Sequence, residues 1–233
     1  IVLSRRSHHD KIADWVDALR KRRGWSEEHP TYLREYMGKW VRDAEGLVYE
    51  FNPSKNLIPR FDKDSAHDWK YVLGIDLGFN DPTAFVIIAY SRAKGRAVVV
   101  ESYKEAGLYP SSAAVRVERF MAKYRLEAIV ADTGGLGKGY EQEWVQRFGI
   151  PVRAAQKHAK MGYIQMLNGD LTSGNLKVAA DLNRPLIEEI SMLQWDADKM
   201  LQNKWEADRK FDDHLADAML YAWREFYHHD RDS

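Results

Sequence analysis

Two aspartates stand at the ends of apolar stretches that have the character of buried strands. Asp76 follows the apolar residues 71–75, and Asp132 follows the apolar residues 128–131. A carboxylate in such a position is costly to bury unless hydrogen bonds or a cation compensate its charge. Each aspartate can therefore bind a metal ion or cap the turn after its strand, and neither residue decides between these roles by itself.

The two carboxylates become informative when their strands are placed in a sheet. A two-residue period puts Asp76 on one strand face with Val72, Gly74 and Gly78, so this face leaves room for a bulky substrate backbone. Open α/β sheets bind ligands at the carboxyl ends of their strands. If the strand of Asp132 lies beside that of Asp76, the two carboxylates repel each other unless a cation lies between them.

A third acidic group lies at the start of the last expected helix, residues 213–227. Asp213 and Asp217 are four residues apart, so they share one side of this helix, away from its apolar stripe. A metal ion would offset their repulsion, and the positive N-terminal end of the helix would help. Asp212 and Asp213 can alternatively serve as helix caps. We expect His214 to be a solvent-exposed residue rather than a metal ligand.

Carboxylates from two strands and one helix suit two Mg²⁺ or Mn²⁺ ions. Oxygen ligands and the absence of Cys favour these ions over zinc. Two ions held about 4 Å apart activate a water molecule and stabilise the leaving oxygen of a phosphodiester. The pattern therefore predicts phosphodiester hydrolysis, with Asp76 as the bridging ligand.

The elements that must position these acids follow the order of the ribonuclease-H-like fold. Three strands separated by short turns predict an antiparallel meander, at residues 71–77, 83–91 and 97–103. Helices and strands then alternate, which predicts parallel pairing, at residues 110–125, 127–132, 140–148 and 150–154. Before the closing helix we expect a helix, a short strand and an edge strand, at residues 161–171, 175–179 and 200–207. We predict an α/β fold with a mixed central sheet, the meander plus parallel strands, flanked by helices.

The first 68 residues have a different pattern from the rest of the chain. They contain two helical patterns, a short strand and a linker rich in Pro, Lys, Asp and Asn, at residues 11–23, 28–40, 46–53 and 52–68. We expect residues 1–68 to be a helical segment with a linker, and residues 69–233 to be the domain that carries the acids.

The composition is that of a globular protein. The 233 residues are 45% hydrophobic and carry 35 basic and 35 acidic side chains, so the formal charge is zero. This balance argues against a histone-like coat of positive charge but allows a local basic groove. The lack of Cys excludes disulfides and thiolate chemistry. We find neither a signal peptide nor an apolar stretch as long as a membrane span.

Over residues 69–223 the chain resembles the nuclease domain of the large terminase subunits of tailed bacteriophages. The shared motifs are Gly74-Ile-Asp-Leu-Gly78 with Asp81-Pro-Thr83, Val130-Ala-Asp132 and, most specifically, Asp212-Asp-His-Leu-Ala-Asp-Ala218. The resemblance implies a nuclease that uses divalent metal to cut concatemeric viral double-stranded DNA at the start and end of packaging.

The last motif departs from many relatives, which place an acid where His214 stands. The third ligand beside Asp76 and Asp132 is therefore left open among Asp212, Asp213 and Asp217, and we favour Asp213.

The resemblance also implies partners and a place of action. Residues 36–40 and 46–49 resemble the region where the packaging ATPase ends, so residues 1–68 would be the end of an ATPase domain of the same protein. A portal and a small terminase subunit are the further partners that the family implies. The expected location is the host cell cytoplasm during virion assembly, without secretion and without contact with a membrane.

Basic residues near the expected site are weaker candidates. Lys138 lies in the glycine-rich residues 134–139, which lack the first Gly and the final Ser or Thr of a phosphate-binding loop, and we find no ATPase motif in this chain. Lys157 and Lys160 open an expected helix beside the site and are candidates for contacts with DNA phosphates. The alternative for these residues is an ordinary solvated helix face.

Three other functions remain open from the sequence. Another nuclease of the same fold, such as a junction resolvase or a ribonuclease H, shares the acids but not the last motif. An ATP-binding lobe of the actin and sugar-kinase type shares the Gly-Ile-Asp-Leu-Gly motif, but it requires a second lobe and lacks an acidic closing helix. A DNA-docking module without activity would place carboxylates against phosphates, which repel them.

Overall fold

The computed structural model describes residues 21, 46–78, 81–132 and 137–231 of the chain. The chain divides into two units, Ile1–Gly46 and Leu47–Ser233. The helices expected at residues 11–23 and 28–40 belong to the first unit and, apart from Lys21, lie outside the described residues. The second unit carries all of the candidate site residues.

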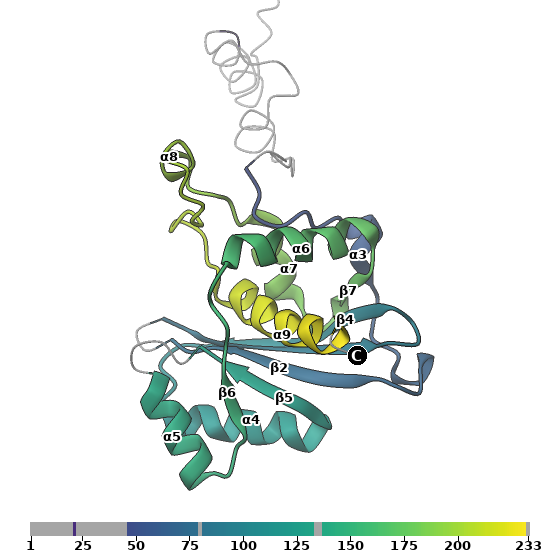
Figure 1. Ribbon diagram of the computed structural model, residues 1–233, viewed down its shortest axis with the longest axis vertical. Helices are drawn as coiled ribbons and strands as arrows, with labels where there is room; N and C mark the ends of the chain where they lie inside the picture. The colour runs from purple at the N-terminus through teal and green to yellow at the C-terminus, as the bar shows by residue number, and fades with distance from the viewer. Residues whose placement is uncertain (1–20, 22–45, 79–80, 133–136, 232–233) are drawn as a thin grey trace, which may run out of the picture. The chain divides into compact units, whose positions relative to one another are not determined.

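A mixed sheet of seven strands lies at the centre of the second unit, in the order β1-β7-β4-β3-β2-β5-β6 (Figure 1). The predicted antiparallel meander is formed by β2 (Lys70–Asp76), β3 (Thr83–Ser91) and β4 (Arg96–Glu105). The other strands pair in parallel and extend the sheet on both sides: β5 (Leu126–Ala131), β6 (Val152–Ala154), β7 (Leu176–Ala179) and β1 (Leu57–Ile58). Because β5 pairs with β2, the carboxyl ends of these two central strands meet at one edge.

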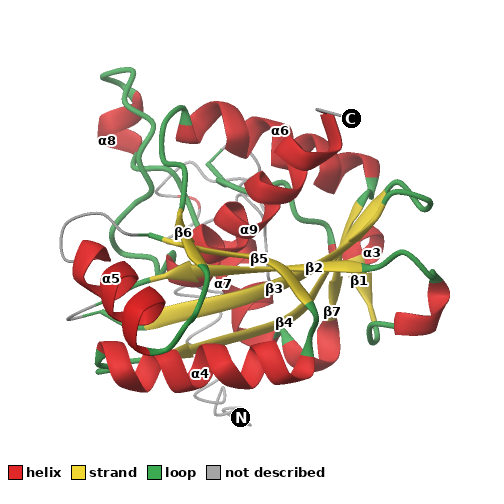
Figure 2. Ribbon diagram, turned by 60° about the horizontal axis from the view of Figure 1, so that its bottom comes forward, coloured by secondary structure: helices red, strands yellow, loops and turns green. Residues whose placement is uncertain are grey.

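Helices cover both faces of this sheet (Figures 1 and 2). One face is covered by α4 (Pro110–Lys123) and α5 (Gly137–Arg147). The other face carries α6 (Lys160–Ser173), α7 (Arg184–Met192) and α9 (His214–Arg231), of which α9 packs directly on β2 and β3. The predicted α/β fold with a mixed, helix-flanked sheet is confirmed. No helix in the part of the chain that the structure describes is both long and apolar enough to cross a bilayer.

Strand β2 shows how the sequence pattern selects the two faces of the sheet. Val72 packs in the core beneath α9, whereas Leu73 and Ile75 pack in the core on the side of α4. Gly74 shares the face of Val72, and a Cβ atom at this position would lie 2.1 Å from the carbonyl oxygen of Ala218 in α9. The missing side chain therefore lets α9 approach the backbone of β2, and this brings the start of α9 beside the carboxyl end of the strand.

The segment at residues 52–68 is part of the fold and not a linker, so this prediction is wrong. It contains α3 (Pro53–Asn56), β1 and the 3-10 helix η1 (Lys63–Ser65). The buried side-chain amide of Asn56 donates hydrogen bonds to carbonyl oxygens in the last turn of α6 and in β7, at 2.8 and 3.0 Å. Local composition does not reveal these bonds, because their partners are 115 and 120 positions away.

The strand predicted at residues 46–53 is also wrong. This stretch contributes one isolated bridge, between Leu47 and Gln194. Tyr49 and Phe51 are nevertheless buried in the core. The apolar pattern therefore reports burial, and a stretch this short does not distinguish burial from strand pairing.

The edge strand predicted at residues 200–207 is absent: α8 (Ala197–Met200) ends where it was expected to begin, and turns and irregular chain follow up to the isolated bridge at Ala207. The Asp196 carboxylate caps α8 by accepting hydrogen bonds from two backbone N–H groups of its first turn. The chain then returns to a single bridge between Trp195 and Ala207. Local capping bonds thus compete successfully with strand pairing here.

Replacing Gly74 by Ala tests the approach of α9 to β2. The added methyl would collide with the backbone of α9, so we expect Gly74→Ala to lower the free energy of unfolding by about 2 kcal/mol or more. Urea denaturation measures this loss. Gly169→Ala is the matched control, because a Cβ at this position in α6 meets nothing within 4 Å, and we expect no loss of stability from it. Equal stability of the two variants would contradict the close contact.

Candidate active site

Asp76 and Asp132 lie side by side at the carboxyl edge of the sheet. Asp76 is the last residue of β2, and Asp132 follows β5 directly. The backbone N–H of Asp132 donates a hydrogen bond of 3.0 Å to the carbonyl oxygen of Ile75. The neighbouring positions that the sequence predicted for the two strands are therefore present.

Helix α9 adds a third carboxylate to this edge. Asp217 lies in the first turn of α9, where its N–H donates to the carbonyl oxygen of Asp213 at 2.8 Å. Only 17% of the Asp217 side chain is exposed. Burial raises the pKa of Asp217 to about 6, the negative charges of Asp213 and Asp76 add to this increase, and Lys160 opposes it.

The charges of three of the acids act on Tyr221. Burial raises the pKa of its phenol, and the negative charges of Asp217, Asp76 and Asp132 raise it further. The charge of Asp213, the ligand that the sequence favoured, raises the pKa values of His214, Asp217 and Tyr49. Asp217 is therefore the acid of this helical segment whose charge acts on Tyr221 together with those of the two strand carboxylates.

His214 belongs to the site, so the expectation of a solvent-exposed residue is wrong. Its side chain is 20% exposed, and Nδ1 lies 2.9 Å from Oδ2 of Asp76. This hydrogen bond to Asp76 raises the pKa of His214 to about 9 against the opposing effect of burial, so the imidazolium donates and the carboxylate accepts. The sequence contained a signal for this role, because residues three apart, such as His214 and Asp217, share one side of a helix.

Two lysines face the other carboxylates. Lys157 forms an ion pair with Asp132, and Lys160 Nζ lies 2.7 Å from Asp217 Oδ1. Both ammonium groups come from the start of α6 or the loop before it, where the sequence predicted contacts with DNA phosphates. Lys138 lies in α5, and its side chain is outside the part that the structure describes.

The carboxylates have the chemistry of a site for hard divalent cations. They supply oxygen ligands and gather negative charge at low exposure, which Mg²⁺ or Mn²⁺ compensates. Within the described residues, however, no three His, Asp or Glu side chains converge on a single point as ready-made ligands. Asp76, Asp132 and Asp217 are instead directed at His214 and at the two lysines.

A buried glutamate, which the sequence did not single out, holds the start of α9. Glu189 of α7 accepts a hydrogen bond from the N–H of Ala216 at 2.7 Å, and only 2% of its side chain is exposed. Lys104 of β4 lies 3.2 Å from the other carboxylate oxygen of Glu189 and also pairs with Asp212. The other carboxylate oxygen of Asp212 lies 3.6 Å from Nε2 of His214. The signal for Glu189 is its position between Leu186 and Ile190 on the apolar face of α7.

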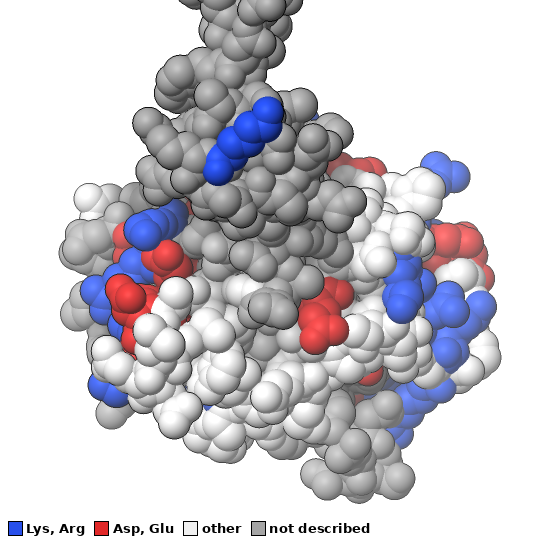
Figure 3. Space-filling model, turned by 90° about the horizontal axis from the view of Figure 1, so that it is seen from above, with Lys and Arg blue, Asp and Glu red and all other residues white. Residues whose placement is uncertain are grey.

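Charges of both signs are mixed on the surface. In the face shown in Figure 3, Lys and Arg side chains lie next to Asp and Glu side chains among the described residues. On this face the described charges are therefore interspersed rather than divided into one basic and one acidic side.

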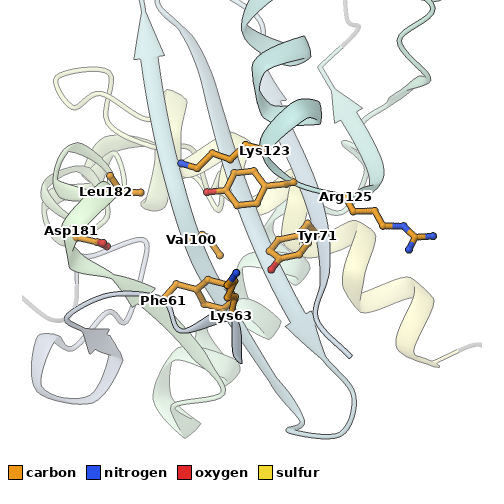
Figure 4. Close-up of a pocket in the computed structure, with 9 residues that line it drawn as sticks. Phe61, Lys63, Tyr71, Val100, Lys123, Arg125, Asp181 and Leu182 are labelled. Atoms are coloured by element: carbon orange, nitrogen blue, oxygen red, sulfur yellow. The ribbon is translucent and has the colours of Figure 1, made fainter. Parts of the chain in front are cut away.

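A separate pocket lies at the opposite end of β2 (Figure 4). Its volume is about 330 Å³, and its lining includes Phe61, Lys63, Tyr71 and Lys123. Tyr71 stands about 17 Å along the strand from Asp76, by the usual rise per residue. This pocket is therefore distinct from the acidic edge.

Comparison with known families decides what kind of domain this is. Residues 73–226 match the family model described as the terminase RNaseH-like domain. The chain belongs to this family. The predicted ribonuclease-H-like fold is therefore confirmed, and the family is the one that the sequence motifs resemble.

Individual relatives agree with this assignment. The large terminase subunit of Escherichia phage T5 is 26% identical over 186 residues, which are 78% of this chain and 41% of that protein. The chain thus spans about two fifths of the length of this relative. The manganese-bound nuclease domain of the bacteriophage SPP1 large terminase has a TM-score of 0.57 at 20% identity and covers 74% of this chain and 97% of its own. The magnesium-bound nuclease of thermophilic phage G20c has a TM-score of 0.60 at 18% identity, covering 77% and 97%.

Substitution of Glu189 tests its hold on the acidic helix of this terminase-family domain. Glu189→Ala leaves the buried N–H of Ala216 without its acceptor, so we expect a loss of about 1–3 kcal/mol in the free energy of unfolding. Glu189→Gln retains an acceptor oxygen and should lose less. Glu188→Ala is the control on the same helix, because its exposed pair with Arg184 contributes about 0.5 kcal/mol. Urea denaturation of the three variants compares these losses, and equal losses for the two Ala variants would contradict the role of Glu189.

Proposed function

We propose that this chain is the metal-dependent endonuclease part of a bacteriophage large terminase. It cuts concatemeric double-stranded DNA at the initiation and termination of genome packaging. The observation that carries the proposal is the placement of three acids at one edge of a terminase RNaseH-like domain: Asp76 ends β2, Asp132 follows the paired strand β5, and Asp217 lies in the first turn of the helix that packs on β2.

These three carboxylates would hold two divalent ions, Mg²⁺ or Mn²⁺, with Asp76 as the bridging ligand. The SPP1 relative binds manganese and the G20c relative binds magnesium or cobalt, which supports this choice of ions. When bound, such ions activate a water molecule and stabilise the leaving oxygen of a phosphodiester. We assign the third position to Asp217 rather than Asp213, because Asp217 shares the surroundings of Tyr221 with both strand carboxylates.

The side chains around the acids have supporting roles in the proposal. His214 holds the Asp76 carboxylate in one orientation through their hydrogen bond. Lys157 and Lys160 neutralise Asp132 and Asp217 in the protein alone. DNA phosphates become their partners when divalent ions take over the carboxylates.

The wider assembly follows from the family. The large terminase of another thermophilic bacteriophage is known with ADP and with ATP-gamma-S, and this chain matches 47% and 51% of the length of those two structures. We propose that an ATPase domain belongs to the same full-length protein as this nuclease. Double-stranded DNA, a portal and a small terminase subunit are its partners, and the host cell is where it acts during virion assembly.

Cleavage of plasmid DNA tests the metal assignment. The protein should nick or cut a supercoiled plasmid with little sequence preference in Mn²⁺ or Mg²⁺, and EDTA should abolish cutting. Asp76→Asn removes a ligand charge with little change in shape, so we expect the rate to fall by about 100-fold or more. Asp181→Asn, in the 3-10 helix after β7, is the control and should cut at the parent rate. A folded Asp76→Asn protein that still cuts in Mn²⁺ would overturn the metal site.

Two further variants identify the third ligand. Asp217→Asn should reduce the cutting rate as strongly as Asp76→Asn, whereas Asp213→Asn should reduce it less. Measurement of Mn²⁺ binding by calorimetry on the same proteins separates lost metal affinity from lost folding. A greater loss of Mn²⁺ affinity in Asp213→Asn would restore Asp213 as the ligand.

A further inference from the structure

A pocket of about 260 Å³ opens directly beside the acidic edge. Asp213 and Asp217 contribute to its wall, and all of its lining residues belong to the second unit. The pocket therefore lies next to the carboxylates that would hold the metal ions in the proposed cleavage of a phosphodiester. The pocket lies close to the size range of sites for small organic groups.

The wall of this pocket combines apolar and charged groups. Ile164 and Trp195 are buried, whereas 45% of the indole residue Trp205 is exposed. The two indoles meet edge to face, with ring centroids 5.6 Å apart at 82°. Lys160 and Arg209 supply positive charge from the same lining.

Trp205 belongs to the segment 194–208, whose two ends are joined by backbone hydrogen bonds beside this pocket. The N–H of Asp196 donates to the carbonyl oxygen of Glu206 at 2.9 Å, and the N–H of Asp208 donates to that of Gln194 at 2.8 Å. Lys199 forms an ion pair with Glu206 within the same segment. Helix α8 lies in its outer part, away from the sheet (Figures 1 and 2). The exposed indole is therefore held in place by backbone bonds.

An unpaired nucleotide matches these groups. A nucleobase stacks on an aromatic side chain irrespective of its identity. Lys160 and Arg209 have the charge to contact the flanking phosphates, and the carboxylate of Asp213 can accept a hydrogen bond from the amino group of a base. A base inside a duplex is paired and stacked between its neighbours, so it does not reach such a pocket without leaving the stack.

We infer that this pocket receives the base of one unpaired nucleotide beside the phosphate that is cut, with Trp205 as the stacking partner. The inference rests on the proposed nuclease function for its choice of DNA as the ligand. It assigns Trp205 as a binding residue that selects locally unpaired DNA. DNA that already has an unpaired nucleotide avoids the cost of unstacking a base and binds more tightly.

Binding of two DNA hairpins to the full chain tests the inference without cleavage. The hairpins carry the same fluorescent label and sequence, and one has a single unpaired nucleotide in its stem. In Ca²⁺, which binds carboxylate oxygens in place of Mg²⁺ or Mn²⁺, fluorescence anisotropy at low salt should show about tenfold tighter binding of the hairpin with the unpaired nucleotide. Trp205→Ala should bind both hairpins equally, while Trp205→Phe should keep most of the preference because it keeps an aromatic ring.

Leu201→Ala is the matched control. Leu201 is an apolar residue of the same segment 194–208, is 88% exposed and lies outside the pocket lining. It should retain the full preference. Equal binding of the two hairpins by the parent protein, or an unchanged preference in Trp205→Ala, would overturn the inference. The proposed nuclease function is tested separately by the cutting of plasmid DNA in Mn²⁺, because that reaction does not depend on a preference for an unpaired nucleotide.

Discussion

The contact between the backbones of α9 and β2 is the constraint on which the rest of the second unit depends. Gly74 provides the space, because a Cβ at this position would collide with the carbonyl oxygen of Ala218. The contact brings together residues that are far apart in the sequence, such as Asp76 and His214, which are separated by 138 positions. Glu189 then holds the first turn of α9 by accepting the N–H of Ala216. Packing and capping together set where the helix presents Asp217.

Charge compensation explains the arrangement of the side chains at this edge. Carboxylates gathered at low exposure repel one another, and each is stabilised by an opposite charge nearby. The chain supplies His214 for Asp76, Lys157 for Asp132 and Lys160 for Asp217. A nuclease of the kind proposed requires both cations for its carboxylates and positive groups for DNA phosphates. The same basic side chains can therefore pair either with the carboxylates or with DNA phosphates.

The long elements were predictable because their patterns extend over many residues. β3 is buried along its whole length, and its nearly continuous apolar run identifies a central strand without knowledge of its neighbours. Short elements failed for the opposite reason. Residues 52–68 are polar and rich in Pro, but Asn56 connects them to α6 and β7. At residues 200–207, where an edge strand was predicted, the chain forms turns that follow the short helix capped by Asp196.

The sequence by itself determined the fold class, the family and the two strand aspartates, because these depend on local periodicity and on contiguous motifs. It also contained every acid of the last motif, and the preference for Asp217 over Asp213 is a proposal that rests on the tertiary structure. Helical spacing places Asp213 and Asp217 on the same side, and only the packing of α9 on β2 brings the start of this helix, with Asp217, beside Asp76. The roles of His214, Glu189 and Trp205 were likewise decided by tertiary structure. Each depends on partners from another part of the chain, and the distance to such a partner is not encoded in any local pattern.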